Sequence, residues 1–366
     1  MITRGARFKR LEVDWLVMNQ RVARTGARPP VALMILNFNG LRWLKDCLSS
    51  AIKVTYPNLK VYLIDNGSTD DSCAFVRSKY PRVRLMPFTK NLGFAEAYDR
   101  AVRGVEAKYV VLLNSDTIVD SDLVSELVAE AESDPKVGSV GCKIVQPNAS
   151  RRYGPVFFTG NGLFIGPLFF GSTIGKDAVY AVYETRTECI ANCGAAVLYR
   201  KSLVDAIGLF DADFWSDWED HDLGFRIRIT GYRNLYSPRR KVLHLGAASY
   251  GSVDSRNRVA RMTRNMLFTY LKNYEARNII LRLFPMIFAI VPYQTVAIIL
   301  DNEFGLLLRR DALRRRKLRA TYGASVTAYL QFLQGLSCVM KKRQVVQSFR
   351  KVSDEDVIKH TSKALI

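Results

Sequence analysis

Three short polar stretches carry the side chains that are best suited to chemistry, and the first is an Asn-Ser-Asp sequence. Asn114, Ser115 and Asp116 follow directly on the apolar run 109–113. In an extended chain Asn114 and Asp116 point to the same side. Two oxygen ligands at this spacing can clamp a hard divalent cation against a diphosphate. The stretch therefore predicts a Mg²⁺ or Mn²⁺ site, although the same residue types are common turn formers at strand ends.

The second stretch joins an aromatic ring to several acids, just before a predicted amphipathic helix: Trp218, Glu219, Asp220, His221 and Asp222. An aromatic side chain can form a platform for a sugar, and a neighbouring carboxylate can act as a general base. Carboxylates in the first turn of a helix are also favoured by the helix dipole, so some of these acids are only caps. His244 ends a predicted strand, a place where a lone histidine is usually structural.

The third stretch is a turn with the sequence DNGSTD, which begins at Asp65. It follows a strand and precedes a predicted helix, and such a turn can hold a nucleobase. Alone it equally fits an ordinary turn with a helix cap. The same is true of NLGFA at 91–95, where Gly93 allows close approach of the backbone to a ligand.

The elements that must position these residues alternate between strands and helices. Strands are predicted at 31–38, 60–66, 83–88 and 109–116, and helices at 41–52, 70–79, 94–103 and 123–133. Continuous apolar strands indicate a mostly parallel sheet covered on both faces. Ligands of such sheets bind beyond the carboxyl ends of the strands, where DNGSTD and NSD fall. Further along, a strand at 194–200, a helix at 201–207 and a strand ending at His244 are predicted, after a substrate-side loop at 146–186.

The composition indicates one large α/β domain with an appendage. The chain has 366 residues and a formal net charge of +20, which predicts an anionic partner. No zinc-finger, RNA-recognition or helix-turn-helix signature accompanies the charge, so we expect no nucleic acid. The six cysteines lack a disulfide or zinc-site pattern and are expected to be reduced and buried. The basic segment 1–30 has no secretory signal pattern.

The C-terminal region combines apolar and basic runs. Residues 279–300 are strongly apolar, but Arg282, Gln294 and two prolines interrupt them. An interfacial or re-entrant helix is therefore favoured over a clean membrane crossing. A basic cluster at 309–319 follows, and then a second apolar run at 322–340. This pattern predicts peripheral or monotopic attachment to an anionic membrane surface, on the cytoplasmic face of the cell membrane. The alternative is a soluble helical subdomain with a solvated basic face.

Taken in order, seven short motifs carry a family resemblance: NFNG at 37–40, DNGSTD, NLGFA, LLNSDT, GLFDADFW, WEDHDLGFR and VLHLG. Over residues 31–275 the chain resembles the family two glycosyltransferases of the GT-A fold, especially their rhamnosyltransferase-like and galactofuranosyltransferase-like branch. The resemblance implies a GT-A domain at 31–275 with a Rossmann-like, mostly parallel sheet. A basic segment at 1–30 and a helical, membrane-associating region at 276–366 complete the expected organisation.

The resemblance also implies roles for single residues. Asp65 would pair with the nucleotide base, Asp116 and His244 would bind the metal, and Asp220, with Glu219 beside it, would be the base. Trp218 would line the sugar pocket. Asn114 stands where relatives have an acid, so it can coordinate only through a neutral amide oxygen. The rest of the expected donor-binding set comes from the same motifs: Asn37, Asn39, Asn66, Asn91, Gly93 and Ser115.

The implied activity is inverting transfer of a single sugar from a nucleotide-diphosphate sugar to a hydroxyl of a lipid-linked glycan. Rhamnose-like sugars, galactofuranose, mannose and glucose are the candidates. A processive polysaccharide synthase is the rival within the class, but the chain has no QxxRW motif. A nucleotidyltransferase would need a glycine-rich basic loop after the first strand, and NFNG is not one. The remaining alternative is a non-catalytic basic module that binds lipid or nucleic acid.

Overall fold

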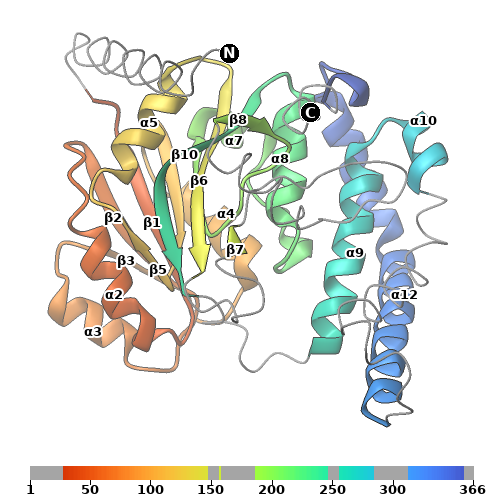
Figure 1. Cartoon of the computed structure of the whole chain (residues 1–366), viewed down its shortest axis with the longest axis horizontal. Helices are drawn as coiled ribbons and strands as arrows, with labels where there is room; N and C mark the ends of the chain where they lie inside the picture. Colours follow the sequence, from red (N-terminus) through yellow and green to blue (C-terminus); the bar gives the residue numbers. More distant parts are fainter. Residues whose placement is uncertain (1–27, 147–155, 158–185, 246–254, 284–311, 358–366) are drawn as a thin grey trace, which may run out of the picture.

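The computed structural model describes residues 28–146, 156–157, 186–245, 255–283 and 312–357. A twisted central sheet fills one side of the molecule, and two long helices, α9 and α12, stand side by side at the other (Figure 1). Most of the predicted loop at 146–186 and most of the apolar run at 279–300 lie outside the described residues.

Within the described part of the chain the sheet has ten strands, and its main path runs β3-β2-β1-β4-β9-β6-β10-β5. The first four strands on this path are parallel, as the sequence predicts: β3 (Arg84–Pro87), β2 (Leu59–Asp65), β1 (Val31–Asn37) and β4 (Tyr109–Asn114). Beyond β4 the sheet is mixed, because β9 (Ala196–Arg200) runs antiparallel between β4 and β6 (Val137–Gln146). β10 (Arg233–His244) lies parallel to β6.

Three short strands complete the sheet. β5 (Thr117–Val119) forms the far edge, antiparallel to β10. β7 (Val156–Phe157) pairs with β6, and β8 (Thr187–Cys189) pairs with β10.

Two hydrophobic cores cover the faces of the sheet, because alternate residues of each strand point to opposite faces. Leu33 and Ile35 of β1 face the core shared with α2 (Leu41–Ala51), α3 (Ser72–Lys79) and α5 (Leu123–Glu132). Ala32 and Met34 face the other core, which α4 (Gly93–Arg103), α7 (Lys201–Ile207) and α8 (Glu219–Ile229) build. The predicted helices are thereby confirmed to within a few residues.

A second helical layer lies outside α8. It consists of α9 (Ser255–Asn273), α10 (Ala276–Asn278), the π-helical turn η2 (Ile279–Leu283) and α12 (Ala312–Ser348). α12 packs closely on α9, because a Cβ added at Gly335 would lie only 2.4 Å from the Phe268 ring. Within the described ranges, no helix combines the length and the apolar character that a bilayer crossing requires.

Two expectations from the sequence are wrong. α8 is not amphipathic: its apolar side chains and even Arg226 and Arg228 are buried, because α8 lies between the sheet and α9. The cysteines are not all buried either, since Cys338 is exposed on α12. All six cysteines are free thiols.

Candidate active site

The carboxyl ends of β1, β2 and β4 bring the first predicted residues together. Asn37 is the register partner of Asp65, and Asn114 is paired with Leu36 on the other side of β1. The buried Asp65 carboxylate accepts hydrogen bonds from Asn37 Nδ2 (3.1 Å) and from the backbone N–H of Ser68 (3.0 Å). These contacts fix Asp65 at the bottom of the DNGSTD turn.

Asn39 joins the two loops that follow β1 and β2. Its backbone N–H donates to Ser68 Oγ (2.9 Å), and its side-chain oxygen accepts from the backbone N–H of Thr69 (2.7 Å). Asn39 takes a left-handed backbone with a φ of 49°, which asparagine tolerates better than most residues. The oxygen of its side chain therefore holds the two loops together, and its predicted contact with the donor stays a prediction.

Asn66 has a similar role in the next loop along the chain. Its amide donates to Asn91 Oδ1 (3.0 Å) and to the Gly93 carbonyl (3.1 Å), and its oxygen accepts from the Leu92 N–H (2.9 Å). The structure thus groups Asn66, Asn91 and Gly93, as predicted, but their polar atoms contact one another. These residues order the edge of the site.

Position 40, next to Asn37 and Ser115, has room only for glycine. A Cβ on Gly40 would lie 2.5 Å from Asn37 Oδ1 and 3.2 Å from Ser115 Oγ. Among the described residues, Asn37 Oδ1 is a buried acceptor that no donor contacts. A buried acceptor of this kind costs stability unless a ligand or water satisfies it.

The predicted metal ligands converge although they come from distant strands. β10 pairs with β5 so that His244 lies opposite Thr117, next to Asp116. His244 Nε2 is 3.2 Å from Asp116 Oδ1 and 3.4 Å from the amide nitrogen Nδ2 of Asn114. Ligands on adjacent corners of an octahedral cation with bonds of about 2.1 Å lie about 3 Å apart, so the spacing of His244 and Asp116 fits two ligands of one ion.

The side chains at this point supply only some of the ligands that a divalent cation requires. Among the described residues, no group of three or more His, Cys, Asp and Glu side chains gathers around one point. Asp116, His244 and the Asn114 amide oxygen could hold a divalent cation if phosphate oxygens and water fill the other positions. Ser115, the residue between the two predicted oxygen ligands, is buried and close to Gly40.

The acid pair at the start of α8 is electrostatically asymmetric. Asp220 Oδ1 accepts from the N–H of His221 and lies 2.8 Å from His221 Nδ1. Burial opposes ionisation of Asp220, but the His221 ring and backbone N–H donors outweigh it and lower the pKa of that carboxyl. Burial, and then the charge of Asp220, raises the pKa of Glu219 well above its usual range. Asp220 is therefore the ionised member of the pair.

The short segment Gly194–Ala195 contacts both Asp220 and Asn114, one of the predicted metal ligands. The N–H of Gly194 donates to Asp220 Oδ2 (3.0 Å), and the carbonyl of the next residue, Ala195, accepts from the N–H of Asn114 (3.0 Å). Asp220 and Asn114 therefore flank the same short segment, which leads into β9. The arrangement can place a base and a leaving-group site close to one bound substrate.

The turn between η1 (Ala212–Phe214) and α8 has a strained backbone. Trp215, Asp217 and Trp218 all have positive φ values, between 62° and 74°. Such a conformation costs about 1–3 kcal/mol for a residue that is not glycine. The turn places Trp218 against His221, with ring centroids 4.5 Å apart, and leaves Trp215 exposed over Gly93.

Sequence reasoning missed the residues that surround this turn. Trp215 lies within the GLFDADFW motif, whose residue types alone do not distinguish it, and only the structure shows that its side chain is exposed. Asp222 is fully buried and binds Arg226 (2.9 Å), Lys272 (3.0 Å) and Asn273 (2.8 Å). This acid anchors α8 to α9, so its role is structural.

A family model describes most of this architecture. The model "Glycosyltransferase like family 2" matches residues 29–267, which include all the site residues above. One characterised relative is the N-acetylglucosaminyl-diphospho-decaprenol L-rhamnosyltransferase of Mycobacterium tuberculosis. It is 27% identical over 227 residues, which cover 57% of this chain and 73% of that protein.

Other relatives share only a fraction of their length with this chain. The uncharacterized protein y4gI of Sinorhizobium fredii is 27% identical over 65% of this chain, and the match spans 27% of y4gI. The poly-beta-1,6-N-acetyl-D-glucosamine synthase of Staphylococcus epidermidis is 23% identical over 57% of the chain, and 48% of the synthase is matched.

Solved structures have the same fold. The mannosyltransferase PcManGT from Pyrobaculum calidifontis, solved with GDP-Man and Mn²⁺, superposes with a TM-score of 0.54 at 16% identity, covering 90% of this chain and 96% of that one. The S. aureus TarS fragment 1-349 with UDP-GlcNAc gives 0.52 at 12% identity, covering 87% and 91%. The chain therefore has the α/β fold of the GT-A glycosyltransferases.

Proposed function

This chain belongs to the glycosyltransferase like family 2, and on that premise we propose that it transfers a single sugar, with inversion, from a nucleotide-diphosphate donor to a glycan hydroxyl. One observation carries the proposal. The ionised Asp220 and Asn114 bind adjacent residues of the Gly194–Ala195 segment, and His244 contacts both Asn114 and Asp116.

In the proposed reaction Asp220 removes the proton from the attacking hydroxyl of the acceptor. The acceptor oxygen bonds to the anomeric carbon from the face opposite the diphosphate, and the bond to the diphosphate oxygen breaks with its electron pair. The lowered pKa of Asp220 keeps it ionised at neutral pH, whereas the raised pKa of Glu219 disfavours a second negative charge beside it. Trp215 and Trp218 offer flat apolar surfaces for sugar rings.

The donor is proposed to bind along the carboxyl ends of β1, β2 and β4. Asp65 and the unsatisfied Asn37 Oδ1 would contact the nucleotide base. Mg²⁺ or Mn²⁺ held by Asp116, His244 and the Asn114 amide oxygen would neutralise the charge on the leaving diphosphate. The Mn²⁺ in the complex of PcManGT supports this element of the proposal by analogy of fold.

The acceptor is proposed to be linked to a lipid carrier, as the name of the mycobacterial rhamnosyltransferase indicates for that relative. Rhamnose-like sugars come first among the candidates, before galactofuranose, mannose and glucose. A row of exposed apolar side chains on α12 (Val326, Leu330, Leu333, Met340) and the net charge of +20 support attachment to an anionic, cytoplasmic membrane face. Because part of a polysaccharide synthase also matches this chain, repeated addition of sugars is the alternative. The length of the product distinguishes repeated addition from addition of a single sugar.

The test begins with wild-type protein and a set of uridine, guanosine and thymidine diphosphate sugars. The true donor should raise the melting temperature only when Mn²⁺ or Mg²⁺ is present. Asp220→Asn should keep this stabilisation but lower transfer at least about 100-fold. Asp205→Asn removes a surface carboxylate paired with Lys201 and serves as the matched control. Full transfer by Asp220→Asn would contradict the proposed base.

A further inference from the structure

The turn that leads into the acid pair is held from a helix far along the chain. Asn265 of α9 is fully buried, and its amide donates to the carbonyls of Phe214 (2.9 Å), Ser216 (3.0 Å) and Asp217 (2.7 Å). One side chain therefore contacts almost every peptide of the turn. A turn with several positive φ values persists only where its surroundings determine it.

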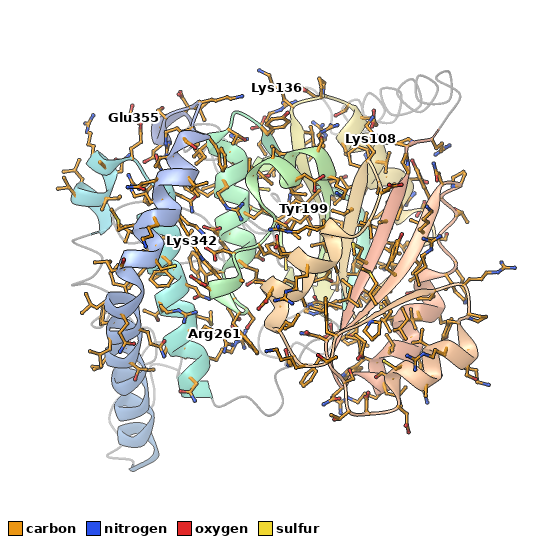
Figure 2. All side chains as sticks on the ribbon, turned by 180° about the vertical axis from the view of Figure 1, so that it is seen from behind. Lys108, Lys136, Tyr199, Arg261, Lys342 and Glu355 are labelled. Carbon is orange, nitrogen blue, oxygen red and sulfur yellow. The ribbon has the colours of Figure 1, made fainter. Side chains whose placement is uncertain are left out.

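Two arginines on the same face of α9 complete the contact. Arg258 and Arg261 bind the two carboxylate oxygens of Asp217, at 3.0 and 2.9 Å, and Arg261 also donates to the Ser216 carbonyl (3.2 Å). Positions 258, 261 and 265 are three and four residues apart, so they fall on one side of a helix. Figure 2 places Arg261 on the side of α9 that faces the rest of the domain.

The turn is attached to α8 on one side and contacts the start of α4 on the other. Trp218 is the N-cap residue of α8, and Glu219 and Asp220 are the first residues of the helix. On the other side, the Trp215 carbonyl accepts from the N–H of Ala95 (3.0 Å), and its indole covers Gly93 at the start of α4. A shift of the turn would therefore move the indole rings and Asp220 together.

We propose that Arg258, Arg261 and Asn265, together the α9 latch, are positioning residues that hold the 215–218 turn in its strained form and so set the acceptor side of the reaction centre. The inference rests on the proposed function. The contacts that carry it end on residues 214–217, whereas the proposed donor-side residues 65, 114 and 116 lie on other elements. Gly93 of the predicted donor set lies under Trp215, but hydrogen bonds to Asn66 and Asn91 hold it from the donor side. The latch should therefore act on acceptor use and catalysis, and leave donor binding unchanged.

Two variants separate the latch from general stability. Asp217→Asn removes the charge that Arg258 and Arg261 bind, and asparagine still tolerates the positive φ of 68°. Asn265→Asp keeps the shape but replaces the three-carbonyl donor with an acceptor. Asp205→Asn on α7 is the matched control, because it also breaks an ion pair by the same exchange. If Asn265→Asp does not fold, Asp217→Asn still tests the latch.

The first measurement is hydrogen exchange of the amides at 213–218 in the full chain. Both variants should exchange at least about 10-fold faster there than wild type and the control. Unchanged exchange would overturn the latch, whatever the protein catalyses.

The second measurement uses GDP or UDP with Mn²⁺ as the donor-site probe and a short-chain N-acetylglucosaminyl-diphospho-prenol as acceptor. We expect kcat/KM for the acceptor to fall about 10- to 100-fold in both variants, because small displacements of reacting groups have effects of this size. The Kd of the nucleotide should change less than about twofold. If kcat/KM for the acceptor and the affinity for the nucleotide fell by the same factor, the contacts would have only a structural role and the proposal would be overturned. No transfer by wild type, with fast exchange in the variants, would instead refute the proposed function alone.

Discussion

At the scale of single residues, the chemistry of the site depends on which of two adjacent acids carries the negative charge. Glu219 and Asp220 are adjacent in sequence, yet the His221 ring and two backbone donors serve only Asp220. Glu219 is buried, and its Oε2 atom has no hydrogen-bond partner among the described residues. Two carboxylates this close cannot both ionise cheaply, so the environment selects which one does.

The buried Glu219 predicts an unusual dependence of stability on pH. Because its folded pKa is raised above the unfolded value of about 4.3, wild type loses stability as the pH rises from that value toward the folded pKa. Glu219→Gln stays neutral, so its melting temperature relative to wild type should increase as the pH rises above about 4.3, and should level off above the folded pKa of Glu219. Differential scanning fluorimetry measures this difference.

The control for this prediction is Glu96→Gln, which removes a carboxylate from a surface pair with Arg100 on α4. A Glu219→Gln difference that stays flat or shrinks with rising pH would mean that Glu219 is ionised in the folded protein.

At the scale of elements, α12 belongs to the folded domain through its contact with α9. Lys342 of α12 binds Asp211, the N-cap of η1, and Asp213 within η1, and Lys272 of α9 binds Asp211 as well (2.7 Å). Burial is unfavourable for the Asp211 charge, but the two lysines outweigh it and lower the pKa of Asp211. Figure 2 shows Lys342 on the side of α12 toward the domain.

The close approach of α9 and α12 predicts whether alanine at position 335 stabilises or destabilises the protein. Alanine normally stabilises a helix relative to glycine by up to about 1 kcal/mol. Gly335→Ala should instead destabilise the protein by about 1–3 kcal/mol, because its Cβ would overlap the Phe268 ring. Urea denaturation measures the free energy of unfolding. In a Phe268→Leu background the same exchange should cost less, and a stabilising Gly335→Ala would show that α12 does not pack here.

The sequence is sufficient to predict elements whose apolar residues follow a simple period. The four parallel strands and α2, α4, α5 and α7 are predicted on this basis and confirmed. β6 escapes prediction because Gly138 and Gly141 weaken its strand pattern, yet side chains of Ile227 and Asn192 leave no room for a Cβ at these positions.

Long-range contacts explain why the site could be predicted only incompletely. The motifs indicate Asp116, Asp220 and His244, but not that β10 and β5 place His244 beside Asp116. The turn at 215–218 is out of reach for local reasoning, since tryptophan disfavours positive φ and Asn265 lies far along the chain. The ligand set and the base stay predictions.

At the scale of the whole molecule, one outer face of α12 remains apolar. Val326, Leu330, Leu333 and Met340 are exposed at spacings of four, three and seven residues, so they line one stripe. The basic cluster 309–319 overlaps the beginning of this helix in sequence. Both features suit a helix that lies on an anionic bilayer with its apolar side inserted.

Membrane attachment therefore predicts a difference between two charge-matched variants. Leu330→Asp with Leu333→Asp should weaken binding to vesicles containing phosphatidylglycerol at least about 100-fold, since each buried leucine contributes about 1.5–3 kcal/mol. Ser78→Asp with Ser202→Asp adds the same charge at exposed polar positions on α3 and α7, away from the stripe, and should have a much smaller effect. Vesicle sedimentation measures both. Equal binding by the two variants would remove the stripe from the interface.

The loops tied together by Asn39 and Asn66 have a consequence for how quickly a donor can bind. Their side chains already satisfy the backbone groups of the turns after β1, β2 and β3. A nucleotide that arrives at this edge meets a surface that needs no rearrangement, so little conformational entropy is lost on association. Stopped-flow association with a nucleoside diphosphate should accordingly give one phase whose rate rises linearly with nucleotide concentration, and discrimination among nucleotides should lie in the dissociation rate.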